Sequence, residues 1–400
     1  MTIDATDPVA LTRALIQCES IAPADDGALG LLEEILTRAG FTCHRLVFSE
    51  SGTYDVDNLY ARIGTTAPNL CFAGHTDVVP PGDLAQWTHP PFAGEITDDI
   101  LYGRGAVDMK GGVACFIAAT LRHLAENDGK PASGSLSFLI TGDEEADAIN
   151  GTVKVLDWLK EKGEVLDACL VGEPSNPNAL GDQMKIGRRG SANGQLVVHG
   201  KQGHVAYPQL ADNPVPKLTK LIDHLASTPI DTGTDNFEPS NLQVTILSVP
   251  NTATNVIPAA ATATFNIRYN DTWRRPTIEA WVHDQLAKAV KAEADNGNEI
   301  SYNITFAGTG DVFLTEPGPL TQTLSNAVEA VTGRKPAPTT GGGTSDARFI
   351  KDACPVIEFG LVNASIHDID EHVPVADLKV LTQIYQRFIA DYFAATVPKT

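Results

Sequence analysis

The most constraining feature of the chain is a run of three acidic residues, Asp143, Glu144 and Glu145, which follows an apolar stretch at residues 136–140. The apolar stretch predicts a buried strand. Three adjacent carboxylates at the end of such a strand repel one another and must be desolvated together. The cluster is stable where cations neutralise it or where it stays solvated at a surface. The fold must therefore bring either metal ions or water to this point.

The bulk composition limits the architecture and the partners. The 400 residues are too many for one small core, so we expect two domains or one large α/β unit with an insertion. Hydrophobic residues make up 42% of the chain and charged residues 20%, as in ordinary globular enzymes. The net charge of −21 argues against nucleic acid or an anionic membrane as a partner. An anionic substrate would need Arg, Lys or metal placed locally.

The cysteines and the N-terminal segment indicate a reducing compartment. The six cysteines are scattered and have no C-x-x-C spacing, so neither a disulfide framework nor a thiolate zinc site is expected. Residues 1–10 lack the basic residues of a signal peptide. The longest apolar run, residues 113–121, is too short to cross a bilayer. We therefore expect a cytoplasmic protein.

Two patterns of secondary structure divide the chain. Residues 1–189 and 304–400 alternate predicted helices with short apolar strands, which indicates an α/β domain with a mostly parallel central sheet flanked by helices. Residues 190–303 follow the order strand, helix, two strands, helix and strand, which is the ferredoxin-like α+β pattern. One of these strands, residues 259–269, alternates apolar and polar positions. We expect residues 190–303 to form a domain inserted into the first.

Residues that bind metals follow most of the apolar strands. His75 and Asp77 follow one strand, Glu173 follows another, and His367 comes a few residues after a third. Because ligands gather at the carboxyl ends of strands in an open α/β sheet, we expect these side chains to meet in one crevice. Asp108 lies instead in the glycine-rich loop 103–112, just before a predicted helix.

The residue types indicate a hydrolytic site with two metal ions. The spacing of His75 and Asp77, roughly 7 Å along a strand, suits a metal-bound imidazole whose other ring nitrogen is oriented by a carboxylate. The two oxygens of Asp108 can bridge two ions. Of Glu144 and Glu145, one can bind metal and the other can act as a general base. Histidine and carboxylate ligands without cysteine suit zinc, with cobalt or manganese as alternatives.

Each candidate has a structural alternative when it is taken alone. His75 could be a satisfied loop histidine, Asp108 a helix N-cap and Glu173 a carboxylate of a surface turn. Local chemistry does not choose between His367 and His372, which lie in the same segment.

Eight motifs carry a resemblance to a known family. Those at residues 73–82, 103–112, 141–145 and 172–175 resemble the dinuclear zinc aminoacylase and carboxypeptidase family of metallopeptidases. Those at residues 184–191, 203–208, 340–346 and 363–367 are similar to the branch of that family that acts on N-succinyl-LL-2,6-diaminopimelate. The resemblance extends over nearly the whole chain. It departs at residues 146–149, where the family commonly has a glycine after the acids.

The resemblance implies two Zn²⁺ ions per subunit, with Co²⁺ able to substitute. One ion would be held by His75, Asp108 and Glu173. The other would be held by Asp108, Glu145 and His367, so that Asp108 bridges the pair.

The resemblance also implies the catalytic roles. Glu144 would be the general base and Asp77 would orient His75. The family's ligand histidine precedes a glutamate by four residues, which selects His367 over His372. The inserted domain would form a homodimer and act as a lid, and His204 would reach the partner's active site to stabilise the oxyanion.

The implied substrate is an N-succinyl amino acid with free carboxylates. Arginine forks suit carboxylates. The candidates for substrate binding are Arg188, Ser191, Tyr207, Asn255, Arg268 and Thr344. Arg189 is an alternative to Arg188, and either arginine could instead form a salt bridge at the domain junction.

The expected function is hydrolysis of N-succinyl-LL-2,6-diaminopimelate to succinate and LL-2,6-diaminopimelate, a reaction of lysine and cell-wall precursor synthesis. A related deacylase or peptidase, such as an acetylornithine deacetylase, is the nearest alternative. A non-catalytic metal-binding dimer is an alternative of another class, and Glu144 argues against it because a scaffold has no use for a base beside the metals.

Overall fold

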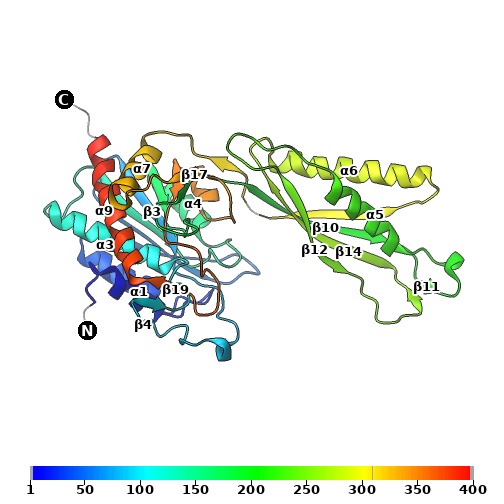
Figure 1. Ribbon diagram of the computed structural model, residues 1–400, viewed down its shortest axis with the longest axis horizontal. Helices are drawn as coiled ribbons and strands as arrows, with labels where there is room; N and C mark the ends of the chain where they lie inside the picture. The colour runs from blue at the N-terminus through cyan, green and yellow to red at the C-terminus, as the bar shows by residue number, and fades with distance from the viewer. Residues whose placement is uncertain (1–2, 309, 397–400) are drawn as a thin grey trace. The chain divides into compact units, whose positions relative to one another are not determined.

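The computed structural model describes residues 3–308 and 310–396. Contacts divide the chain into two compact units. Unit 1 comprises Met1–Ile186, Thr315–Thr339 and Ser345–Thr400, and unit 2 comprises Gly187–Leu314 and Thr340–Thr344. The second boundary predicted from the sequence, between residues 303 and 304, falls inside strand β15 (Ser301–Ala307). Figure 1 labels the main elements of both units.

Unit 1 contains an eight-stranded sheet whose central strands are parallel. Its order is β1 (Thr42–Phe48), β2 (Val56–Ile63), β6 (Ser135–Thr141), β3 (Asn69–His75), β7 (Ala168–Val171), β18 (Val356–Glu358), β8 (Gln183–Lys185) and β17 (Ala337–Thr339). Strands β6, β3, β7 and β18 run parallel to one another, whereas β2 is antiparallel to both of its neighbours, β1 and β6. The predicted mostly parallel central sheet is confirmed.

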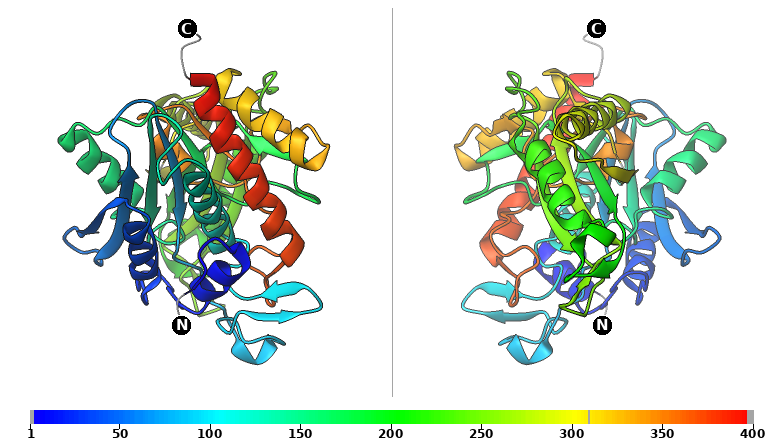
Figure 2. Two further views of the ribbon diagram at one scale, coloured as in Figure 1. Left: turned by 90° about the vertical axis from the view of Figure 1, so that its left-hand side faces the viewer. Right: turned by 90° about the vertical axis from the view of Figure 1, so that its right-hand side faces the viewer.

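Helices cover both faces of this sheet (Figure 2). The helices of one face are α1 (Pro8–Ile16), α3 (Lys110–Glu126), α7 (Pro319–Thr332) and α9 (Val375–Thr396). Those of the other face are α2 (Ala28–Arg38) and α4 (Thr152–Lys162), and α4 contacts the short helix α8 (Ala347–Ile350). Val113, Phe116 and Ile117 of α3 are fully buried, and the ring of Phe116 stacks on Phe72 of β3 with centroids 4.3 Å apart. Burial of these aromatic side chains fixes α3 against the sheet.

A small three-stranded sheet extends unit 1. It consists of β19 (His372–Pro374), β5 (Ile100–Tyr102) and β4 (Glu95–Thr97), and the turn η1 (Leu84–Gln86) precedes it.

Unit 2 is an antiparallel sheet packed against two helices. The sheet order is β12 (Asn241–Ser248), β14 (Ala260–Tyr269), β10 (Gly190–His199) and β15, and the helices are α5 (Pro214–Ser227) and α6 (Arg275–Asp295). Along the chain these elements run β10-α5-β12-β14-α6-β15, so the predicted ferredoxin-like pattern is confirmed. Ala261, Ala263, Phe265 and Ile267 of β14 are fully buried in the core of this unit, as their alternation predicted.

Short elements complete unit 2. They are β9 (Gly187–Arg188), β11 (Gly203–His204), η2 (Pro208–Leu210), β13 (Val256–Ile257) and β16 (Phe313–Leu314). Within the described part of the chain, no helix has the length and apolar character needed to cross a membrane.

Candidate metal centre

The parallel strands of unit 1 deliver side chains to one edge of the sheet. In the β3–β6 ladder His75 pairs with Thr141, and in the β3–β7 ladder Ala73 pairs with Val171, so the three strands end together. Their carboxyl ends therefore lead directly into the segments that carry Asp77, the three acids and Glu173. This alignment explains how residues far apart in the sequence become neighbours.

One group of side chains surrounds His75, which is 1% exposed. Its Nε2 lies 3.1 Å from Oδ1 of Asp108 and 3.7 Å from Oε1 of Glu173. Its Nδ1 lies 2.9 Å from the backbone carbonyl oxygen of Asp77 and 3.6 Å from the Asp77 carboxylate. The backbone of Asp77 is therefore the closer partner of the ring.

The Asp77 carboxylate has a second task. It accepts hydrogen bonds from the backbone N–H groups of Glu144, at 3.3 Å, and Glu145, at 2.9 Å. Asp77 therefore ties the end of β3 to the acidic segment that follows β6.

A second group of side chains surrounds His367. Its Nε2 lies 2.8 Å from Oε1 of Glu145 and 3.3 Å from Oδ2 of Asp108. Asp108 thus presents one carboxylate oxygen to each histidine. His372 belongs to β19, where its Nδ1 lies 2.8 Å from the carbonyl oxygen of Asp370 and its ring lies 5.3 Å from that of Tyr102. The geometry brings His367 to the acids and holds His372 in a different set of contacts.

Two sets of ligand atoms among the described residues lie within 4.8 Å of one another, close enough to hold a metal ion. One set is His75, Asp108 and Glu145, and the other is His75, Glu144 and Glu173. Five carboxylates, including Asp77, surround only two imidazoles here. This excess of buried negative charge and the nitrogen and oxygen donors fit divalent cations of the zinc type.

Burial and mutual repulsion perturb the titration of these groups. Burial, followed by the charge of Glu173, raises the pKa of Glu144 well above its usual value. Burial also raises the pKa of Asp77 to about 6. Hydrogen bonds to Asp108 and Glu145 raise the pKa of His367 to about 10. Strongly perturbed groups gathered at one point are typical of a functional site.

Contacts with neighbouring groups outweigh the effect of burial on the pKa values of His75 and Asp108. Burial by itself would lower the pKa of His75, but the hydrogen bond to Asp108 and the charge of Asp77 raise it well above its usual value. Burial would raise the pKa of Asp108, but the hydrogen bonds from His367 and His75 lower it.

The adjacent acids Asp143, Glu144 and Glu145 make different contacts. Asp143 is directed away from the two histidines: its Oδ1 accepts from the Tyr54 hydroxyl at 3.1 Å, and its Oδ2 accepts from the N–H groups of Ile149 and Asn150, both at 2.9 Å. Asp143 therefore folds the loop that Glu144 and Glu145 occupy. Ala148 in this loop has φ of +54°, a left-handed conformation that glycine adopts more easily. Ala148 belongs to the segment 146–149, where the family commonly has a glycine, and an alanine in this conformation costs about 1 kcal/mol.

A glycine in the first turn of α3 allows this helix to lie close to the end of β7. A Cβ atom at Gly112 would lie 2.6 Å from the carbonyl oxygen of Gly172, which precedes Glu173. Only glycine allows the first turn of α3, and with it Asp108, to come this close to the end of β7.

Two charged residues without a role in the sequence analysis lie beside the cluster. Arg104 is 3% exposed and Glu371 is fully buried. Both residues belong to motifs that the sequence analysis used. Arg104 lies in the glycine-rich loop 103–112, and Glu371 is the glutamate four residues after His367. Their contact with each other could not be predicted from the sequence, because it joins two irregular segments.

All of the predicted substrate residues and His204 belong to unit 2, where they fall into three groups. His204 pairs with Val256 across β11 and β13, its ring lies 5.8 Å from that of Tyr207, and the carbonyl oxygen of Asn255 accepts from Val205 N–H. These three candidates therefore lie on or beside one two-stranded sheet, β11–β13.

The other two groups are separate from the β11–β13 sheet. Ser191 pairs with Arg268 across β10 and β14. Arg188 donates to the carbonyl oxygen of Gly343, the neighbour of Thr344, at 3.1 Å. Arg189 instead lies 3.5 Å from exposed Glu238, so the two adjacent arginines have different surroundings.

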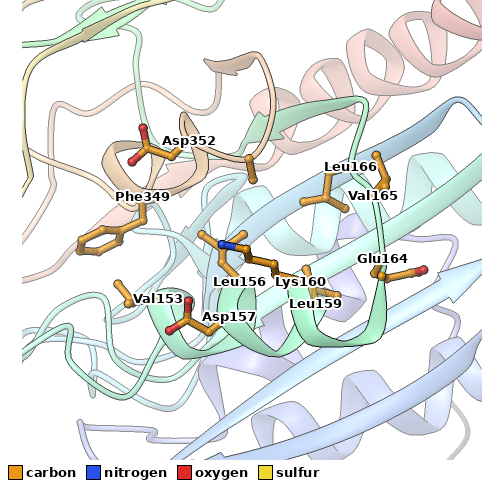
Figure 3. Close-up of a pocket in the computed structure, with 12 residues that line it drawn as sticks. Val153, Leu156, Asp157, Leu159, Lys160, Glu164, Val165, Leu166, Phe349 and Asp352 are labelled. Atoms are coloured by element: carbon orange, nitrogen blue, oxygen red, sulfur yellow. The ribbon is translucent and has the colours of Figure 1, made fainter.

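A cavity of about 580 Å³ lies elsewhere in unit 1 (Figure 3). Its walls come from α4, the segment after it, and the region of α8, with Leu156, Leu166 and Phe349 among its apolar residues. None of the predicted site residues lines it. This cavity is therefore separate from the candidate metal centre.

Comparisons with known proteins identify the family of this chain. The family model described as peptidase family M20/M25/M40 matches residues 71–391. A curated relative from Rhodopseudomonas palustris (strain BisB18), named succinyl-diaminopimelate desuccinylase, is 56% identical over 98% of this chain and 100% of its own length.

Solved structures share the fold. An M20 family metallo-carboxypeptidase from Sulfolobus solfataricus has a TM-score of 0.77 at 17% identity, covering 96% of this chain and 99% of that one. A Bacillus subtilis protein described as a dinuclear metal binding peptidase from the M20 family has a TM-score of 0.69 at 15% identity, covering 96% of this chain and 97% of that one. The family match covers most of the chain and includes every candidate metal ligand, and the chain belongs to peptidase family M20/M25/M40.

Proposed function

We propose that this protein is a metal-dependent amide hydrolase that converts N-succinyl-LL-2,6-diaminopimelate to succinate and LL-2,6-diaminopimelate. The observation that carries the proposal is the 56% identity, over nearly the full length of both chains, to a relative named for this reaction. The buried cluster of acids and imidazoles supports the metal dependence, because amide hydrolysis needs an activated water and a stabilised oxyanion.

The proposed metal centre has two parts. The His75 site consists of His75, Asp108 and Glu173, and the His367 site consists of Asp108, Glu145 and His367. The contacts of each Asp108 oxygen with a different histidine support a bridging role. Two bound cations, which we propose to be Zn²⁺ with Co²⁺ able to substitute, would polarise the amide carbonyl and lower the pKa of a water.

Glu144 is the proposed general base. Its carboxylate lies close enough to His75 and Glu173 to share a metal position with them, and burial raises its pKa well above the usual value. A base of raised pKa accepts a proton from the attacking water more readily and can donate it to the leaving amine. Of the two adjacent glutamates, Glu145 is assigned as the metal ligand because it contacts His367.

His204 is the proposed oxyanion donor. Its Nδ1 accepts the backbone N–H of Ala206 at 3.0 Å, so the neutral ring carries its proton on Nε2. Because the His204 side chain is exposed, its Nε2–H can donate a hydrogen bond to a substrate. Donation of this hydrogen bond to the tetrahedral oxyanion would stabilise the transition state.

Recognition of the substrate carboxylates is assigned to unit 2. Arg188 and Arg268 supply positive charge in a chain of net charge −21, and Ser191 faces Arg268 across the sheet. Tyr207 and Asn255 lie beside His204 at the β11–β13 sheet, and Thr344 completes the set. Arginine forks and hydroxyl groups of this kind distinguish a succinyl group from an acetyl group by its additional carboxylate.

We also propose that the protein is a homodimer formed through unit 2. Strand β12 is an edge of its sheet, and Ile246, Leu247 and Val249 on or beside it are 57%, 60% and 40% exposed. An edge strand with exposed apolar side chains is a template for pairing with another chain. In the proposed dimer, His204 acts on the active site of the partner.

A substrate panel tests the function. Purified protein is assayed on N-succinyl-LL-2,6-diaminopimelate, N-acetyl-L-ornithine and a dipeptide, with metal analysis of the same preparation. We expect kcat/KM for the succinyl substrate to exceed the others at least a hundredfold, because unpaired polar groups penalise the acetyl compound. A higher kcat/KM on the acetyl or dipeptide substrate would make the protein a related deacylase or peptidase.

The same experiment tests the alternative of another class. Stoichiometric metal without hydrolysis of any substrate would indicate a non-catalytic metal-binding dimer.

A further inference from the structure

We propose that Glu371 and Arg104 form a positioning clamp that holds Asp108 and His367 at their mutual distance and thereby sets the metal affinity of the His367 site. The inference rests on the two-site assignment proposed above. Neither residue is a proposed ligand, and each acts through its contacts with the segments that carry the ligands.

The first half of the clamp is the Glu371 carboxylate, which is fully buried and uses both oxygens. Oε1 accepts from the backbone N–H groups of Val107, at 2.8 Å, and Asp108, at 3.2 Å. Oε2 accepts from the N–H of Gly105 at 3.0 Å and from Nη1 of Arg104 at 2.8 Å. One carboxylate therefore organises the backbone of the loop that ends in the bridging ligand.

The second half of the clamp is Arg104, whose guanidinium reaches the segment that carries His367. Nη1 donates to the carbonyl oxygen of Asp368 at 3.3 Å, and Nη2 donates to that of His367 at 3.4 Å. The guanidinium carbon also lies 5.2 Å from the centre of the Trp87 ring. The planar guanidinium of arginine makes these contacts simultaneously, which a lysine ammonium cannot reproduce.

The segment that carries His367 needs such support. His367 has φ of +60°, a left-handed conformation that is costly for a residue with a side chain and persists only where surrounding contacts impose it. The segment is closed locally by Ser365, whose hydroxyl donates to the carbonyl oxygen of His372 at 2.8 Å and accepts its N–H at 3.1 Å. Closure at Ser365 fixes the shape of the segment, and Arg104 fixes its position relative to Asp108.

The two halves of the clamp predict different losses. Arg104 contacts the His367 segment directly, through the carbonyl groups of His367 and Asp368, and reaches the backbone of Asp108 only through Glu371, so its removal should weaken the His367 site more than the other. Glu371 holds the backbone of Asp108, which is shared, so its removal should weaken both sites. Outer residues that orient metal ligands commonly contribute 10–100-fold to metal affinity.

Calorimetric titration of chelator-treated protein with Zn²⁺ tests this difference. For Arg104→Gln we expect the affinity for one of the two Zn²⁺ ions to fall 10–100-fold and that for the other to change less than threefold. For Glu371→Gln we expect both affinities to fall at least tenfold. Activity at limiting Zn²⁺ should fall in parallel and should recover in excess Zn²⁺ for Arg104→Gln.

A matched control and a double variant identify the affected site. Arg62→Gln breaks the Arg62–Glu164 pair, 2.6 Å long and in the same unit, and should leave both affinities within threefold of the unaltered protein. Adding Arg104→Gln to His367→Ala should cause no further loss, because the supported ligand is already gone. Full additivity of the two changes would overturn the clamp, as would unchanged or equally weakened binding at both sites in folded Arg104→Gln.

Arg104→Lys covers the case in which Arg104→Gln does not fold without metal. Lysine keeps the positive charge but cannot donate the same pair of hydrogen bonds. Arg104→Lys should therefore lower the Zn²⁺ affinity of the same single site, by a smaller factor than Arg104→Gln. An equal loss of affinity at both sites would contradict the clamp. If the unaltered protein binds fewer than two Zn²⁺ ions, the proposed two-metal function fails instead, whatever the variants do.

Discussion

Some functional candidates of the two units have opposite surroundings. In unit 1, His75 and Glu173 lie at or just after the ends of neighbouring parallel strands and are only 1% and 8% exposed. In unit 2 Tyr207 is 56% exposed, and His204 beside it is also exposed. Burial of like charges in unit 1 is costly unless cations are bound, whereas exposed polar side chains in unit 2 are stable alone.

The comparison separates two ways of building a site. The candidate metal ligands of unit 1 already contact one another within one chain. The exposed side chains of His204 and Tyr207 in unit 2 are accessible to a substrate or to a second subunit.

The largest effect is expected for Glu144→Gln. Loss of the general base should lower kcat by about 10²–10⁴-fold, while the ligands of both metals remain. Kinetics together with elemental analysis measures the two properties on one preparation. The matched control is Asp147→Asn, which removes an exposed acid of the same loop and should leave kcat unchanged. Near-normal turnover by Glu144→Gln would show that the base is another residue.

A smaller effect is expected for His204→Ala. The variant should keep its metal and lose at least tenfold in kcat, because one oxyanion donor is removed. His283→Ala, a change to another exposed histidine of unit 2, is the control and should have no effect. Equal kinetics for the two variants would exclude His204 from the reaction.

Leu247→Lys tests whether unit 2 assembles with a second copy. A charge on the edge strand β12 should give a monomer in light scattering, since edge lysines oppose strand pairing. Turnover should then fall to the level of His204→Ala, because the donor comes from the partner. The matched control is Val47→Lys, on edge strand β1 of unit 1. Val47 is 61% exposed and Leu247 is 60% exposed, so both variants add a charge at a similarly exposed position. Val47→Lys should leave the dimer intact. A Leu247→Lys dimer with normal turnover would contradict the proposed interface.

The smallest effect is expected from pH. In the metal-free protein the pKa of His367 is raised to about 10 and that of His75 is raised well above its usual value. The folded state then binds more protons than the unfolded state between pH 6.5 and about 10, so the free energy of unfolding falls as pH rises through this window. We expect Tm of the metal-free protein to fall by a few degrees there.

Metal-loaded protein is the control for the pH experiment. Metal ligation requires neutral imidazoles, so the proton-linked loss of stability should be absent between pH 6.5 and 10. The same decline of Tm with and without metal would show that the histidines do not share their sites with cations.

The sequence predicted much of unit 1 because parallel strands end at a common edge. His75, Glu145 and Glu173 each follow an apolar strand, and strand order alone brings them together. The choice between His367 and His372 could not come from local residues, since they stand five apart in an irregular segment. The structural role of Asp143 was equally hidden, because its partners, such as Tyr54, are distant in the sequence.

The sequence predicted less about the detailed contacts of both units. The ferredoxin-like pattern followed from alternation, but the pairing of Ser191 with Arg268 depends on strand register. The clamp of Arg104 and Glu371 depends on the meeting of two loops, for which no periodic pattern exists. Tertiary contacts between irregular segments are set by packing, and residue spacing does not encode them.

The most direct measurement is to titrate chelated, inactive protein with Zn²⁺ while following hydrolysis of N-succinyl-LL-2,6-diaminopimelate. We expect activity to return and to saturate at two Zn²⁺ ions per chain, with no recovery in a His75→Ala variant. Full activity in the metal-free protein, or equal recovery in the His75→Ala variant, would contradict a reaction centred on the buried acids and imidazoles of unit 1.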